Sequence, residues 1–146
     1  MSAYSFLNIV AAIAGPGAAF NIGAGAQVAE EGITIAPSED KNVMVIGADG
    51  RGQHTLIASN GGLVTLRLLK VSPTNGFLQL AYDLQTASSA LWGQNIITVA
   101  DKARNELTTC QSCAFKKKPE IVYDKAGPML EWTFDSLAIN SILGLN

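Results

Sequence analysis

The sequence has 146 residues, of which 48% are apolar and 15% are charged, and its net charge at pH 7 is −2. This length suits one domain, and the high apolar content with a low net charge excludes an intrinsically disordered chain. A pI near 5.3 excludes the electrostatic footprint of a nucleic-acid-binding protein. Ordinary soluble domains have about 25% charged residues, so we expect other protein, in particular copies of the same chain, to cover much of this surface.

The N-terminal part of the chain has no charged side chain before Glu30. A secretory signal needs a basic segment, whereas the first basic residue is Lys41. A membrane-spanning helix needs about 20 apolar residues, and the Gly-Pro-Gly sequence at 15–17 interrupts any such run. We therefore expect no membrane insertion, synthesis in the cytoplasm, and free thiols at Cys110 and Cys113.

The first predicted elements are two strands, at residues 4–14 and 18–22, joined by the turn at 15–17. The glycine- and alanine-rich stretch 23–26 has no side chain that fixes a conformation, so we interpret it as a flexible connection or an extended arm. A short strand at 32–35 then ends at Pro37.

The next region predicts a hairpin followed by a third strand. A polar turn at 38–41 leads into a largely apolar strand at 42–48, which returns through the turn at 49–52 as a strand at 53–58. Residues 60–62 form another predicted turn, and a strand follows at 63–70. We expect these three consecutive strands to form a meander.

One helix is predicted, and it begins after Ser72, which can cap it, and Pro73, which suits its first turn. The helix can continue as far as Leu91. The apolar residues that recur at helical spacing are Phe77, Leu80, Ala81 and Leu84.

Further strands are predicted at 95–100, 108–116, 120–123 and 129–139. In the last strand apolar and polar residues alternate, which is typical of a half-buried strand. Leu130, Trp132 and Phe134 share one face, and Glu131, Thr133 and Asp135 share the other. The fold class that results is mainly β: an antiparallel β-sandwich or barrel with one flanking α-helix.

No motif indicates catalysis, a metal or a cofactor. Cys110 and Cys113 lie in a predicted strand, where positions i and i+3 point to opposite faces, and we interpret both as small buried hydrophobes. His54 is the only histidine and is expected on the surface of the hairpin. The glycine-rich stretch at 23–28 lacks the last position of the dinucleotide-binding fingerprint. The sequence therefore predicts a protein that is not an enzyme and needs no cofactor.

The charged clusters are better explained by assembly than by chemistry. Neighbouring carboxylates at 30–31 and 39–40 diverge on an extended chain, so we interpret them as solvated or interface charges. The lysines at 116–118 can blunt a strand edge or pair with an acidic patch of a neighbouring subunit.

Several stretches of the chain together carry a family resemblance. They are YSFL at 4–7, AEEGITI at 29–35, EDKN at 39–42, IGADG at 46–50, VTLRLLK at 64–70, QTASSA at 85–90 and EWTFD at 131–135. In this order and spacing they resemble the tail tube proteins of contractile-tailed bacteriophages and prophages, from about Tyr4 to Gly144. Cys113 departs from the family pattern.

The resemblance implies a structural virion protein whose hexameric rings stack into a tube inside a contractile sheath. Double-stranded DNA and the tape-measure protein would pass through the lumen without specific binding, and the tube would contact sheath, baseplate and tail terminator proteins. It also implies a virion-tail location after synthesis in the host bacterial cytoplasm. In tubes of this type each subunit gives four strands to a shared inner barrel.

We expect a single domain, 1–146, with an extended N-terminal region. We hypothesise that the segment 37–52 is an assembly loop that, with the glycine-rich stretch before it, reaches a neighbouring subunit or ring. The alternatives are another tail or baseplate ring component, a phage-related secretion or tailocin tube protein, and a small-ligand-binding β-barrel. The candidate interface residues are Glu39, Asp40, Lys41, Asp49, Arg51, Lys116, Lys117 and Lys118.

Overall fold

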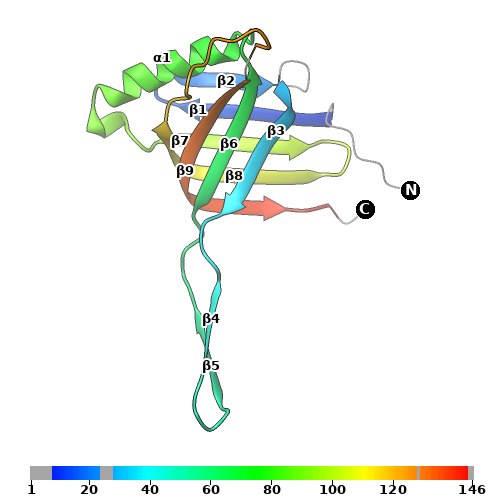
Figure 1. Ribbon diagram of the computed structural model, residues 1–146, viewed down its shortest axis with the longest axis vertical. Coiled ribbons are helices and arrows are strands. Elements are labelled where there is room, and N and C mark those ends of the chain that lie inside the picture. Colours follow the sequence, from blue (N-terminus) through cyan, green and yellow to red (C-terminus); the bar gives the residue numbers. More distant parts are fainter. Residues whose placement is uncertain (1–7, 24–27, 128, 145–146) are drawn as a thin grey trace.

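The computed structural model describes residues 8–23, 28–127 and 129–144. Seven strands form one antiparallel sheet in the order β2-β1-β7-β8-β9-β6-β3, and two further strands, β4 and β5, form a separate hairpin (Figure 1). The strands are β1 (Ile9–Gly15), β2 (Ala18–Gly23), β3 (Val28–Pro37), β4 (Asn42–Ile46), β5 (Gly52–Leu56), β6 (Gly62–Leu69), β7 (Asn95–Asp101), β8 (Glu106–Lys117) and β9 (Met129–Ile142). The helix α1 spans Thr74–Thr86, and a 3-10 turn follows at Ser89–Leu91. The mainly β, antiparallel architecture with one helix confirms the predicted fold class.

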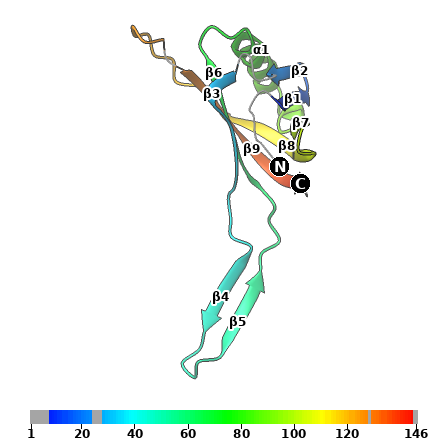
Figure 2. The ribbon, with the colours of Figure 1, turned by 90° about the vertical axis from the view of Figure 1, so that its right-hand side faces the viewer.

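The core lies between the sheet and α1, which covers one face of the sheet near β1 and β2 (Figure 2). The alternation predicted for β9 is confirmed on this face, since Leu130, Trp132 and Phe134 are buried. Phe115 of β8 joins them, and its ring centroid lies 4.6 Å from that of Phe134. Aromatic rings at such distances attract one another beyond the effect of burial alone, so they hold β8 and β9 firmly together.

The helix turns a different face to the core than its apolar spacing suggests. Ala81 is buried with Leu78 and Gln85, whereas the other three periodic residues are 46% to 67% exposed. The Gln85 amide nitrogen donates to the Asn95 side-chain oxygen and to the Pro16 carbonyl, each at 2.8 Å. Because these bonds satisfy a buried amide, a polar residue can occupy the inward face. Neither described helix is long and apolar enough to cross a membrane.

The predicted hairpin is confirmed, but the meander is wrong. β6 pairs with β3 and β9, not with β5. Pro37 pairs with Gly62, so the chain leaves the sheet after β3 and re-enters it beside the same strand. A hydrogen bond of 3.2 Å from the Ser38 backbone nitrogen to the Gly61 carbonyl closes the root of this excursion. The hairpin is therefore a projection from the β3–β6 connection (Figure 1).

Several predicted boundaries are corrected. β3 is much longer than the expected 32–35, because Gly32, at φ 62°, takes up a register irregularity that lets pairing with β6 continue back to Val28. The segment 120–123 is not a strand. The helix ends at Thr86, since Ser88 takes an extended backbone and its side chain accepts from the Ala90 nitrogen. The predictions for residues 4–7 and 24–27 lie outside the described residues.

Candidate assembly interface

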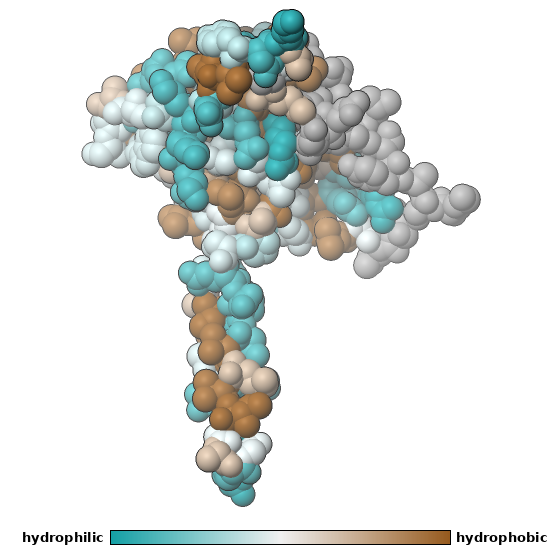
Figure 3. All heavy atoms as spheres, in the orientation of Figure 1, coloured by the Kyte–Doolittle hydropathy of each residue, from teal (hydrophilic) through white to brown (hydrophobic). Residues whose placement is uncertain are grey.

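The hairpin β4–β5 is the most exposed element of the described chain. None of its residues is buried, although β4 is almost entirely apolar. It extends away from the sheet along the long axis of the molecule (Figure 1), and hydrophobic side chains line it (Figure 3). The exposed fractions of its large apolar residues run from 46% to 83%, for Val43, Met44, Val45, Ile46 and Leu56. A two-stranded hairpin is marginally stable alone in water, so this surface is suited to contact with other protein.

The two faces of the hairpin differ. Met44 pairs with His54 in a register that puts Ile46 and Leu56 on the same side, because successive residues of a strand alternate between faces. Val43 and Val45 lie on the other side, opposite threonine and glutamine. The face of Met44, Ile46 and Leu56 is therefore the more apolar one.

Lys41, one of the predicted interface residues, is engaged within its own subunit. Its ammonium group donates to the carbonyl oxygens of Ile57 at 3.2 Å and Ser59 at 2.7 Å, and to the Asn60 side chain at 2.6 Å. These bonds join the segment before β4 to the segment after β5 at the hairpin root. Lys41 thus positions the hairpin and has little capacity left for a partner.

The other charged candidates of this region are exposed. At the hairpin tip, an Asp49 side-chain oxygen accepts from the Arg51 backbone nitrogen at 3.1 Å, and the two side chains form a loose ion pair at 3.9 Å. Gly50, at φ 86°, gives the turn the backbone conformation it needs. Glu39 and Asp40, at the root, form no salt bridge with any residue that the structure describes. Tip and root therefore present exposed charges to solvent.

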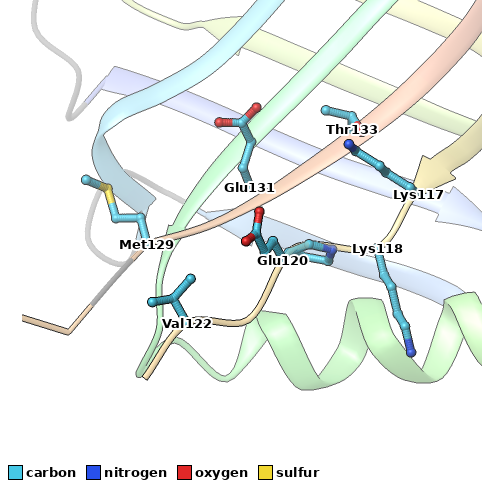
Figure 4. Close-up of a pocket in the computed structure, with 8 residues that line it drawn as sticks. Lys117, Lys118, Glu120, Val122, Met129, Glu131 and Thr133 are labelled. Carbon is cyan, nitrogen blue, oxygen red and sulfur yellow. The ribbon is translucent and has the colours of Figure 1, made fainter. Parts of the chain in front are cut away.

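The three lysines do not form one patch. Lys116 borders a depression with residues of the hairpin root, including Pro37 and Ser38. Lys117 and Lys118 line a separate open groove of about 490 Å³ at the end of β8. There Lys117 extends toward Thr133 and Lys118 toward α1 (Figure 4). The Lys118 ammonium lies 5.9 Å from the Tyr82 ring centre, a cation–π geometry that holds it on the helix.

The sequence analysis did not predict this groove, and it did not predict that the loop beside it is exposed. The loop between β8 and β9 exposes Ile121, Val122 and Tyr123, which had suggested a strand. Lys70 reaches this loop, with its ammonium 3.6 Å from the Tyr123 ring centre. The signal was present in the three apolar residues after Pro119, but their lack of burial could not be inferred from the pattern alone.

The sheet also has two open edges. β2 and β3 are the first and last strands in the sheet order, and each pairs on one side only within the described part of the chain. Unpaired strand edges carry free backbone donors and acceptors that invite pairing with another chain. The two edges are therefore further surfaces with which another protein chain can pair.

The cysteines and the histidine have the environments expected of structural residues. Both thiols are free and buried, as predicted. They lie on the same side of β8, which corrects the expectation of opposite faces: Ser112, at φ 53°, sits in a bulge that breaks the alternation. Burial, reinforced by Cys113, raises the pKa of Cys110 to about 12. His54 is exposed, and its Nδ1 lies 3.1 Å from the Asn42 amide nitrogen.

Among the described residues no group of three or more histidine, cysteine or acidic side chains is placed to hold a metal ion. The features that distinguish this chain are therefore surfaces, which comprise a projecting hairpin, an open groove and two strand edges.

Several solved chains share this fold. A chain of the sheath–tube complex of the extracellular contractile injection system PVC, in its extended state, gives a TM-score of 0.58 at 9% identity and covers 92% of this chain and 88% of that one. The tube-terminating cap of the anti-feeding prophage gives 0.60 at 7%, with coverages of 99% and 93%. The sheath/tube terminator of PVC gives 0.60 at 10%, with coverages of 97% and 98%.

The sequence comparisons identify the family. No curated protein matches the chain. Residues 1–144 match the sequence profile of the family described as bacteriophage PhiTE tail tube protein. The chain therefore belongs to the bacteriophage PhiTE tail tube protein family, and it is a structural component of a virion tail, not an enzyme.

Proposed function

We propose that six copies of this chain form a ring, and that rings stack into a tail tube inside a contractile sheath. The lumen conducts double-stranded DNA and contains the tape-measure protein before ejection. The tube meets the sheath along its length, the baseplate at one end and the terminator at the other. The subunit is made in the cytoplasm of the host bacterium.

The observation that carries this proposal is the hairpin β4–β5, an apolar projection with no buried residue. A monomer gains nothing from placing Val45 and Ile46 in water, since burial of such side chains stabilises by roughly 1.5–3 kcal/mol each. A neighbouring subunit supplies that burial. The segment 37–52, which contains the hairpin root, β4 and the hairpin tip, is therefore the proposed assembly loop of the domain 1–146.

The open edges of the sheet support ring formation. When copies stand side by side in a closed ring, the β2 and β3 edges can be covered by neighbouring subunits, and the closed assembly then presents no free edge. The small negative net charge of −2 supports DNA passage, because strong attraction between the wall and phosphate groups would slow transport.

Electron microscopy of the purified protein and of isolated tails tests the proposal. The expected result is long filaments of constant bore. The likeness of this fold to a tube-terminating cap and to a sheath/tube terminator favours one alternative, a component that ends the tube. Such a component gives single rings and no filaments, and a ligand-binding β-barrel gives a monodisperse monomer in light scattering.

Charge reversal at the hairpin root tests the assembly loop. The double variant Glu39→Lys with Asp40→Lys should impair tube growth and leave the folding of the subunit intact, because both side chains are exposed and without described ion pairs. The matched control, Glu39→Gln with Asp40→Asn, removes the charge without reversing it and should have a smaller effect. Normal tubes from the reversed variant would count against a role of these carboxylates in assembly.

A further inference from the structure

We infer that the groove between the β8–β9 loop and the start of β9 is the receptor for the β4–β5 hairpin of the next copy along the tube. This inference rests on the proposed function, and it names the two surfaces that meet between stacked rings. We call the groove the receptor groove; it is lined by Lys117, Lys118, Pro119, Glu120, Val122, Met129, Glu131 and Thr133.

The hairpin and the receptor groove lie at opposite ends of the subunit. In both ribbon views the hairpin extends downward from the sheet, and the β8–β9 loop is at the upper end (Figures 1 and 2). A projection at one end and a recess at the other form a head-to-tail contact, which cannot be satisfied within one symmetric pair. Such contacts propagate from copy to copy and build a filament when the copies are related by rotation and translation.

The receptor groove has the mixed chemistry that the hairpin tip requires. Val122 and Met129 are more than 40% exposed and give it an apolar wall, which suits the apolar face of Met44 and Ile46. Lys117 supplies a cation for the exposed Asp49 at the tip. Opposite charges that meet across an interface fix register more than they raise affinity.

Acidic groups of the groove complement the other tip charge. Glu120 forms no salt bridge with any described residue, whereas Glu131 is 3.6 Å from Arg67. Glu120 is therefore the carboxylate available to Arg51, which is highly exposed at the tip. Each charge of the hairpin tip thus has a counterpart in the receptor groove.

An unsatisfied hydroxyl points to a missing partner in the same place. Thr133 is 91% buried, because only 9% of its surface is exposed, and it lines the receptor groove. Its hydroxyl oxygen has no hydrogen-bond partner among the described residues. Leaving such a group unpaired costs free energy, and because the oxygen is shielded from solvent in the free subunit, the Thr133 side chain must shift on docking to pair with a hairpin group.

The other exposed apolar surface, on α1, fits the hairpin less well. Phe77, Leu80 and Leu84 form a stripe on a convex helix, and α1 carries an acid, Asp83, but no basic residue in its last turn. The helix itself contains no lysine or arginine for Asp49, and Lys118, which lies over Tyr82, belongs to the lining of the receptor groove. The hairpin therefore matches the receptor groove in both shape and charge, and α1 serves as the comparison surface in the test.

Disulfide trapping in assembled tubes tests the inference. The double variant Ile46→Cys with Val122→Cys, oxidised with copper phenanthroline, should give a ladder of covalent multimers on denaturing gels. The control pair, Ile46→Cys with Leu80→Cys, should give none. The native cysteines are buried, and burial raises the pKa of both thiols, so they contribute no background. A ladder from the control pair, or none from the first pair in visible tubes, overturns the inference.

Carbodiimide coupling of the wild-type tubes gives a second test that needs no substitution. The reagent joins a lysine amine to a carboxyl group with loss of water, which converts the carbodiimide to a urea. In tubes assembled from mixed ¹⁴N and ¹⁵N subunits, Lys117 should be linked to Asp49 of a different copy. Links from Lys117 that join it only to other parts of the chain would overturn the inference.

A matched pair of lysine variants adds a functional readout. Lys117→Glu should lower the yield of tubes about tenfold or more, because it opposes the hairpin carboxylate. Lys102→Glu should change it much less, since that lysine is exposed in the turn between β7 and β8 and does not line the receptor groove. Equal effects of the two variants would overturn the role of Lys117. If the wild-type chain forms no tubes under any condition, the proposed function itself fails, which is a separate and visible outcome.

Discussion

The sheet and the hairpin of this protein are built from similar residues and yet have opposite environments. β6 and β4 are both rich in aliphatic residues, but β6 is largely buried, whereas every residue of β4 is exposed. The difference lies in what each strand can pair with inside one subunit. β6 has a strand on each side, and β4 has β5 alone. Apolar composition therefore marks surface to be buried, and the topology decides which molecule buries it.

This comparison separates two kinds of stability. Removing a side chain from the sheet should lower the free energy of unfolding of the subunit, whereas removing one from the hairpin should lower the stability of the assembly. The free energy of unfolding of the subunit should therefore change most for substitutions in the core and least for those on the hairpin.

The largest effect is expected in the aromatic core. Phe134→Ala removes a fully buried ring and should lower the free energy of unfolding by about 3–5 kcal/mol, measured by chemical denaturation of the unassembled subunit. The matched control is Phe77→Ala on α1, where the ring is half exposed and should cost much less. Similar losses at the two positions would mean that the exposed helix face is packed in the free subunit.

The next effect concerns the buried amides that connect α1 to the sheet. Gln85→Leu leaves the Asn95 side-chain oxygen and the Pro16 carbonyl without their donor, so it should cost about 1–3 kcal/mol. Gln79→Leu, on the same helix but only partly buried and bonded to Asp83 alone, should change the free energy of unfolding much less. The melting temperatures of both variants, measured by thermal unfolding, test this prediction. Equal melting temperatures would show that the hydrogen bonds of Gln85 do not stabilise the subunit.

A smaller and local effect is expected at the hairpin root. Lys41→Met removes three hydrogen bonds that join the root to Ile57, Ser59 and Asn60. These bonds are exposed, so the loss should be about 1 kcal/mol and should speed amide hydrogen exchange in the hairpin without changing global unfolding. Lys125→Met, in an exposed loop, is the control. Unchanged exchange in the Lys41 variant would show that the root is held by the Ser38–Gly61 contact alone.

The sequence predicted local features better than pairing. The turn at 15–17, the hairpin turn at 49–52 and the alternation of Leu130, Trp132 and Phe134 depend on neighbouring residues, and all three are confirmed. The partner of β6 depends on a strand far away in sequence, and consecutive pairing was the wrong expectation. Periodicity also could not show that Gln85 would face inward, because that choice depends on a distant asparagine.

The candidate interface shows the same division. Exposed charges at the hairpin were predictable because turn chemistry places them there, but the geometry divides the eight candidates among several places. Lys41 is used internally, and Lys116 and Lys117 line different depressions. The receptor groove combines the end of β8 with the start of β9. No local pattern brings these two segments together, since their pairing is a property of the folded sheet.

The smallest effect on the subunit should accompany the largest effect on the tube. Ile46→Ser, on the apolar face of the hairpin, should leave the free energy of unfolding within about 0.5 kcal/mol of wild type, since this side chain is exposed. The same variant should form few or no filaments, because the serine removes apolar surface that the next copy buries. Thr55→Ala, on the opposite face of the hairpin, is the control and should assemble normally. A variant that loses subunit stability would place Ile46 against its own sheet, and a variant that assembles normally would remove the hairpin from the interface. Either result would contradict the difference between the two regions. That difference requires the sheet to be stabilised within its own subunit and the hairpin to be stabilised by a neighbouring copy.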